Sequence, residues 1–188
     1  MIKPYNSSEN KKKEIKKMFN NIAKSYDTLN RILSLGIDIW WRKKAVKQLN
    51  NPKKILDIAT GTADFAISAA KNTNASIIGI DISDNMLEIG EKKIKKLNLE
   101  NRIILKLGDA EETNFQENSF DAITIGFGVR NFENLDLGLK EMYRILKKDG
   151  KVAILEPSIP TLFPFKQIYT LFFCLYHHLR IIGSTSLL

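Results

Sequence analysis

The chain has 188 residues and a net charge of +8; 44% of its residues are hydrophobic and 27% are charged. This length suits one domain, and the apolar content excludes a disordered chain because it is enough to bury a core. Cys174 is the only cysteine, which excludes an internal disulfide and a cysteine metal site, and the N-terminus lacks the apolar segment of a secretory signal.

The positive charge has two interpretations. An acidic partner, either nucleic acid or an anionic membrane surface, would account for it. A general overuse of lysine along the chain would also account for it. The longest run of lysines is residues 11–13, followed closely by the pair at 16–17, and the other lysines are spread along the chain instead of forming one block, so the second interpretation is favoured.

The first 51 residues have helical patterns. Apolar side chains recur at helical spacing at Ile15, Met18, Phe19, Ile22 and Tyr26, which predicts a first helix. Residues 29–36 form a second apolar stretch that ends at a glycine. Residues 38–49 predict a third helix, with the aspartate at position 38 as its N-cap. We therefore expect a helical lid over residues 1–51 and a separate core over residues 52–188.

Strand and helix patterns alternate after residue 52. Strands are predicted at residues 53–59, 75–81, 102–109, 120–127 and 151–158, and helices at 64–72, 83–99 and 134–150. The middle helix begins after a serine that suits an N-cap, and the last is predicted to end at a glycine. Such alternation indicates parallel βαβ units in a doubly wound, Rossmann-like α/β sheet.

A small-residue turn follows the first predicted strand in "ILDIATGTADFAI", which contains Asp57 and Gly61. Ligands of doubly wound sheets bind beyond the carboxyl ends of the strands, and small residues let the backbone approach them closely. Asp81 ends the next strand 20 residues after Gly61, where a carboxylate could bind ribose hydroxyls or cap the following helix. Asp109 ends the third strand. Three acids at three strand ends favour a nucleoside ligand with a cationic centre, and S-adenosylmethionine fits.

Three further segments carry a family resemblance: residues 26–41, 126–144 and 144–158. With the turn, they resemble the class I S-adenosylmethionine methyltransferases, and more narrowly the methylases of menaquinone and ubiquinone synthesis. The resemblance extends from Ile15 to Gly183. It implies C-methylation of a prenylated quinol ring with S-adenosylmethionine. The turn sequence "GTAD" favours demethylmenaquinol as the substrate.

The resemblance also implies the roles of individual residues. Those expected to bind the cofactor are Asp57, Gly61, Thr62, Asp81, Asp109 and Ala110. Arg130 is the candidate for stabilising a quinol oxyanion, with a surface salt bridge as the alternative. Tyr26 would orient the ring or the methyl donor, or would simply end the apolar stripe. No metal site is expected, since the only histidines, His177 and His178, are adjacent.

The implied partner is the prenylated quinol, and no nucleic-acid substrate is expected because the motifs of nucleic-acid methylases are absent. The enzyme would be cytoplasmic, with contact at the inner face of the membrane. The aromatic-rich residues 161–183 would line a tunnel for the prenyl tail or contact the membrane, or would pack as an ordinary buried helix. The basic N-terminal helix would lie on an anionic surface, or would cover the cofactor with its lysines in solvent.

Family members continue beyond the length of this chain with a further helix and two strands. The resemblance therefore implies a sheet that is truncated at its C-terminal strands and has an exposed edge. A non-catalytic remnant of the enzyme is therefore one alternative function, and a methyltransferase for another small molecule is a second, independent one.

Overall fold

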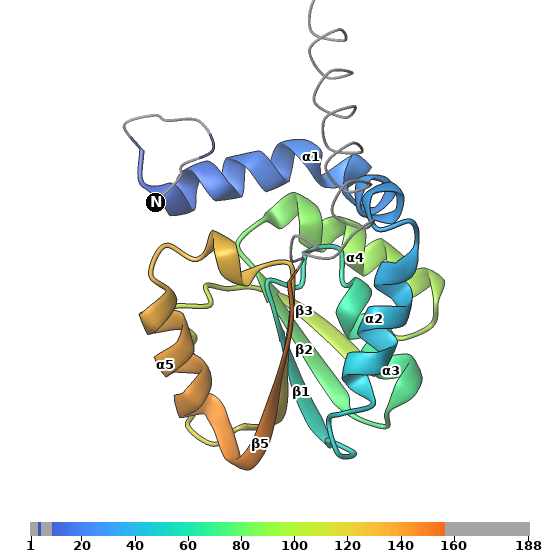
Figure 1. Ribbon diagram of the computed structural model, residues 1–188, viewed down its shortest axis with the longest axis vertical. Helices are drawn as coiled ribbons and strands as arrows, with labels where there is room; N and C mark the ends of the chain where they lie inside the picture. The colour runs from blue at the N-terminus through green and yellow to red at the C-terminus, as the bar shows by residue number, and fades with distance from the viewer. Residues whose placement is uncertain (1–3, 5–8, 157–188) are drawn as a thin grey trace, which may run out of the picture. The chain divides into compact units, whose positions relative to one another are not determined.

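Five parallel strands form the centre of the protein (Figure 1). The structure is a computed structural model that describes residue 4 and residues 9–156. The strands are β1 (Lys54–Ile58), β2 (Ser76–Asp81), β3 (Ile103–Leu107), β4 (Phe120–Gly126) and β5 (Leu146–Leu155), arranged in the order β3-β2-β1-β4-β5. The order reverses between β1 and β4, and ligands of such sheets bind at that point. The predicted doubly wound fold is confirmed.

Alternate residues of the central strand β1 face opposite layers of the core. Ile55 packs in one cluster with Phe65, on the side of α3 (Asp64–Asn72). Leu56 packs in the other cluster with Met142, on the side of α5 (Leu135–Ile145). Because both faces of β1 are covered, its side chains form a continuous buried run rather than an alternating pattern.

Polar side chains cap the N-termini of three of the described helices. Asn10 caps α1 (Lys11–Leu33), Ser83 caps α4 (Asp84–Lys96) and Asn134 caps α5, each through a side-chain oxygen that accepts a backbone N–H three residues later. The prediction for Ser83 is confirmed. A short 3₁₀ helix, η1 (Val129–Asn131), follows β4.

The N-terminal helices differ from the sequence prediction. α1 is unbroken from Lys11 to Leu33, so the first two predicted segments form one helix. Gly36 does end it: its φ is +78° and its N–H donates to the carbonyl of Arg31 at 2.9 Å. α2 (Ile37–Val46) begins directly after this glycine, so Asp38 lies in its first turn and the prediction of Asp38 as N-cap was wrong.

The last predicted helix was too long at its C-terminal end. α5 ends at Ile145, and Leu146 already pairs with Phe120 as the first residue of β5. The N–H groups of Asn118 and Ser119 donate to the carbonyls of Arg144 and Ile145 at 3.1 and 2.8 Å. Residues outside the helix therefore provide hydrogen bonds for the carbonyl groups at its C-terminal end. The glycine at position 150 therefore lies inside the strand.

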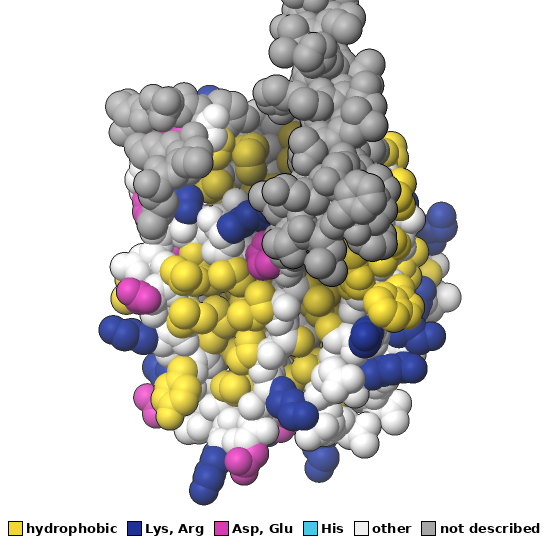
Figure 2. All heavy atoms as spheres, in the orientation of Figure 1, with side chains coloured by type: hydrophobic (Ala, Val, Ile, Leu, Met, Phe, Trp, Pro, Cys, Tyr) yellow, Lys and Arg dark blue, Asp and Glu magenta, His cyan; other side chains and the backbone are white. Residues whose placement is uncertain are grey.

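β5 is an outer strand of the described sheet. Figure 2 shows hydrophobic side chains between the positions of α5 and β5, and Tyr143, Val152 and Ile154 are exposed there. Among the described residues, β5 pairs with β4 alone. The expectations for residues 161–183, which include Cys174 and the two histidines, lie outside the described residues. In the described part of the chain, no helix is long and apolar enough to cross a bilayer.

Candidate functional site

A cavity lies at the carboxyl ends of the strands, and α1 forms one of its walls. It encloses about 660 Å³ of empty space, part of which is open to solvent. Five of the eight predicted site residues line it: Tyr26, Gly61, Asp81, Asp109 and Ala110. Its apolar lining includes Phe19, Met86 and Phe132, as expected for a cavity that binds a small organic molecule.

A second, smaller cavity adjoins the first at the turn after β1. It encloses about 330 Å³ of empty space and is lined by Asp57, Thr62 and Arg42. Tyr26 and Gly61 line both cavities. The turn and Tyr26 therefore form the boundary between the two spaces.

The turn itself has an unusual backbone. Ala59, Gly61 and Ala63 have φ values of +51°, +55° and +66°, in the left-handed region that side chains disfavour. A Cβ on Gly61 would approach Cε1 of Tyr26 at 3.8 Å, so it would occupy the space between the turn and this ring. Strained backbone of this kind is concentrated at functional sites.

Asp81 joins this turn to the loop after β2. Its Oδ2 accepts the N–H of Gly61 at 2.8 Å, and its Oδ1 accepts the N–H of Ser83 at 2.8 Å. The side chain is almost completely buried, and burial raises its pKa although these backbone N–H groups act to lower it. Each carboxylate oxygen keeps a further lone pair, with which it could accept a hydroxyl from a ligand in the larger cavity.

Asp57 lies beneath the turn and does not line the larger cavity. It is fully buried, and it accepts the hydroxyls of Thr60 and Thr124 at 2.6 and 2.5 Å. Burial raises its pKa to about 6. The hydrogen bond between Asp57 and Thr60 therefore fixes the position of this residue of the turn.

The first turn of α1 is attached to the rim of the larger cavity. Lys12 forms ion pairs with Asp109 and Glu111, and the ammonium of Lys11 donates to the carbonyl of Phe132. Burial lowers the pKa of Lys12, but the hydrogen bonds and charges of Asp109 and Glu111 together outweigh burial and raise it overall. The alternative that placed the lysines of this helix in solvent was therefore wrong for Lys11 and Lys12.

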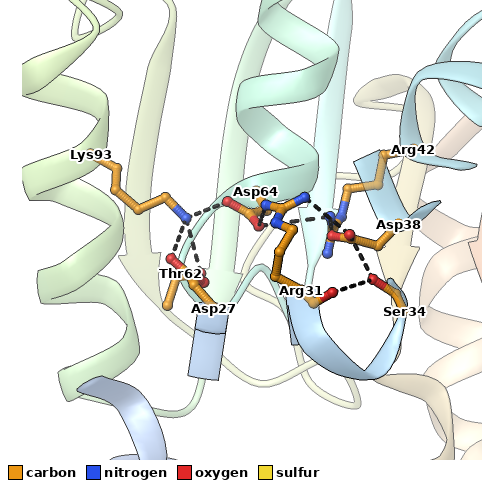
Figure 3. A network of polar contacts seen from close by, with 8 residues as sticks. All are labelled: Asp27, Arg31, Ser34, Asp38, Arg42, Thr62, Asp64 and Lys93. Carbon is orange, nitrogen blue, oxygen red and sulfur yellow. Dashed lines mark hydrogen bonds and ion pairs between the residues drawn. The ribbon is translucent and has the colours of Figure 1, made fainter. Parts of the chain in front are cut away.

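A polar network connects the N-terminal helices to the turn (Figure 3). Asp64, the first residue of α3, forms ion pairs with Lys93, Arg31 and Arg42. Lys93 also forms an ion pair with Asp27 at 2.8 Å, and Asp27 accepts the hydroxyl of Thr62. Because Arg31, Arg42 and Lys93 balance the charge of Asp64, this acid does not present an unpaired negative charge at the turn.

The same network contains a buried ion pair. Asp38 is 1% exposed; it accepts the hydroxyl of Ser34 at 2.8 Å and pairs with Arg31 and Arg42. Sequence reasoning missed this network. Its clearest signal was the spacing of Asp38 and Arg42, four residues apart on one helix. The partners from α3 and α4 had no such local signal.

The two predicted catalytic residues occupy different surroundings. Tyr26 is mostly buried between the cavities, and burial raises the pKa of its hydroxyl, so the phenol is neutral at physiological pH. Its ring packs edge-on against Phe19. Arg130 lies in η1, lines neither cavity, and pairs with Glu156 at 3.3 Å.

Known proteins of similar sequence share one description. The ubiE/COQ5 methyltransferase family matches residues 6–185. The demethylmenaquinone methyltransferase of Bacteroides fragilis is 48% identical over 174 residues, which cover 91% of this chain and 71% of that protein. The ubiquinone/menaquinone biosynthesis C-methyltransferase UbiE of Citrifermentans bemidjiense is 49% identical over 167 residues, which cover 87% of this chain and 71% of that protein.

A solved structure extends the likeness to three dimensions. A Methanococcus maripaludis protein, described as an S-adenosyl-L-methionine-dependent methyltransferase, superposes with a TM-score of 0.66 and 29% identity. The match covers 72% of this chain and 62% of that chain. The family match, the two relatives and this fold agree with the cavity at the carboxyl ends of the strands. The chain therefore belongs to the ubiE/COQ5 methyltransferase family.

Proposed function

We propose that this protein transfers the methyl group of S-adenosylmethionine to a ring carbon of a prenylated quinol, with demethylmenaquinol as the preferred substrate. The observation that carries the proposal is the junction of Asp81 and Gly61 at the wall of the larger cavity. The names of the two relatives support the substrate class.

The residues present fit this cofactor. Asp81 is a nearly buried acceptor beside a turn that has no side chain at Gly61, so a ribose could approach both closely. We assign the adenine to the wall that contains Asp109 and Ala110, and the Thr62 side of the turn to the amino-acid end. When bound, the cofactor supplies an electrophilic methyl group on a sulfonium.

The protein's contribution to the chemistry is positioning. A quinol ring is already nucleophilic, so the chain needs mainly to align the ring carbon with the methyl group and to exclude water. Tyr26, neutral and between the two cavities, can donate a hydrogen bond to a quinol oxygen. Arg130 could favour the quinol oxyanion only by leaving Glu156.

The organisation and location of the protein belong to the same proposal. α1 and α2 act as the lid of residues 1–51, because Lys12, Phe19 and Tyr26 of α1 contribute to the wall of the larger cavity. Residues 52–188 are assigned to the core. A cytoplasmic enzyme that works at the inner face of the membrane would meet its prenylated substrate there.

Product analysis tests the proposal. The full chain is incubated with S-adenosylmethionine carrying a deuterated methyl group and with a short-tailed demethylmenaquinol or the matching benzoquinol. We expect one labelled methyl group on the naphthoquinol ring by mass spectrometry, and less on the benzoquinol. Thermal stabilisation by S-adenosylhomocysteine without any product would support the non-catalytic remnant. Labelling of other small molecules but neither quinol would support the third alternative.

A further inference from the structure

The polarity of α2 is the reverse of an ordinary surface helix. Two of the three residues on its buried side are the polar pair Asp38 and Arg42, with Val46 as the third, whereas Ile37, Trp40 and Trp41 are exposed. A surface helix of a globular protein normally turns its apolar stripe towards the core. The arrangement indicates that the outer side of α2 is adapted to an apolar environment.

The end of α1 and the loop to α2 continue this surface. Ile32, Leu33 and Leu35 are exposed, and Leu35 is 77% exposed. Together with α2 they form an apolar surface that we call the α1–α2 corner: Ile32, Leu33, Leu35, Ile37, Ile39, Trp40 and Trp41. Scattered exposed apolar residues are normal, but seven within ten consecutive residues form a patch of the kind that marks an interaction site.

Basic side chains border the corner. Lys43 and Lys44 are exposed on α2 and Lys47 is exposed directly after its end, and the ammonium of Lys44 lies 4.9 Å from the centre of the Trp40 ring. In Figure 2, hydrophobic side chains and Lys or Arg side chains meet along the edge where Figure 1 places α2. Asp38 is the only acid between residues 28 and 50 and is buried, so this segment of the chain exposes lysines but no carboxylate.

We propose that the α1–α2 corner docks on the surface of an anionic lipid bilayer. Tryptophan and aliphatic side chains would enter the interface, while the three lysines would contact the headgroups. The exposed charge disfavours a second copy of the chain as the occupant, because two corners would oppose lysines to lysines. The inference deepens the proposed function, since a prenylated quinol is carried in lipid.

Trp40 and Trp41 are the only tryptophans of the chain, so fluorescence reports on the corner directly. The full chain is titrated with vesicles of phosphatidylcholine alone, and with equimolar phosphatidylcholine and phosphatidylglycerol. We expect a blue shift of the emission, and quenching by brominated acyl chains, on the anionic vesicles. Both should be weaker on the neutral vesicles and at high salt.

Variants and matched controls locate the contact. The triple variant Lys43→Glu, Lys44→Glu, Lys47→Glu should lower the partition coefficient at least about tenfold, given the usual contribution of each surface lysine. Trp40→Ser should also lower it, with Trp41 kept as the probe. Tyr143→Ser, exposed on α5, is the matched control for Trp40→Ser, and Lys140→Glu on the same helix is the control for the single variant Lys44→Glu; both controls should bind as the wild type does.

Several results would overturn the proposal. They are an absence of blue shift in the wild type, equal binding to neutral vesicles, equal losses in the α5 controls, or dimerisation without lipid that Trp40→Ser abolishes. Methylation of a short-tailed soluble quinol is measured in parallel and should be unchanged in the corner variants. If the wild type did not methylate this quinol, the proposed function would be refuted. The vesicle experiments would still test the docking surface independently.

Discussion

Replacing Asp57 with asparagine should make the protein more stable at neutral pH. The folded-state pKa of Asp57 is about 6, compared with 3.8 for an ordinary aspartate. The folded protein therefore binds the proton more tightly than the unfolded chain. Its contribution favours folding at low pH and is lost as the pH rises through about 6.

The size of the effect follows from the difference between the two pKa values. At 1.36 kcal/mol for each pKa unit, the ionised carboxylate costs about 3 kcal/mol of folding stability above pH 6. Asparagine keeps the shape without the charge, and the hydroxyls of Thr60 and Thr124 can rotate to accept from its amide. The gain of Asp57→Asn over the wild type should therefore be about 2–3 kcal/mol larger at neutral pH than at about pH 4.

Urea unfolding of both proteins at the two pH values measures this difference. Asp121→Asn is the matched control, because the hydrogen bond from Lys147 lowers the pKa of Asp121 and should give a dependence of opposite sign. A difference between Asp57→Asn and the wild type that does not change with pH would refute the reasoning. So would a wild type that gains on the variant as the pH rises.

Three other substitutions test the assignments at the site and its surroundings. Asp81→Ala should weaken S-adenosylmethionine binding about 10- to 100-fold by calorimetry, and unchanged affinity would remove the ribose assignment. If the planar guanidinium of Arg130 reaches the quinol, Arg130→Lys should lower kcat without changing cofactor affinity. An unchanged kcat would show that Arg130 has no role in catalysis beyond its ion pair with Glu156. The hydrogen bond from Arg144 lowers the pKa of Glu141 to about 2, so its stabilisation is present above its unfolded pKa and is lost as the pH falls towards 2. Glu141→Gln should therefore lower the free energy of unfolding by about 1–2 kcal/mol at neutral pH, and by less in acid; an equal loss at both would contradict this.

The sheet and the position of the turn could be predicted from sequence because their signals are local. A buried strand such as β1 is a short apolar run that ends in turn residues, and Ser83 begins α4 with the usual side-chain cap. The predicted α3, residues 64–72, agrees with the structure at both ends. The end of α5, by contrast, depended on partners elsewhere in the chain, because Asn118 and Ser119 bond its last carbonyls.

The surroundings of the site could not be predicted because they depend on contacts between distant segments. Lys12 meets Asp109, and Lys93 meets both Asp27 and Asp64, across long stretches of sequence. Spacing along one helix cannot reveal such pairs, since each requires the fold to bring two elements together. For this reason the sequence allowed the lysines at the start of α1 to lie in solvent, whereas the structure pairs Lys12 with Asp109.

Three acids at three strand ends were expected to face one cationic ligand, but the structure gives each a different electrostatic environment. Asp57 is buried against two hydroxyls, which cannot offset its loss of water, so its pKa rises. Asp109 is paired with Lys12, which already supplies a positive charge. Asp81 is held by two backbone N–H groups at the wall of the larger cavity. The sequence could place the three carboxylates at the ends of their strands. It could not show that, of the three, only Asp81 both lines the larger cavity and has no charged partner among the contacts described. Recognition of a ribose at Asp81 therefore requires no rearrangement of an ion pair, whereas a ligand at the Asp109 carboxylate would have to compete with Lys12.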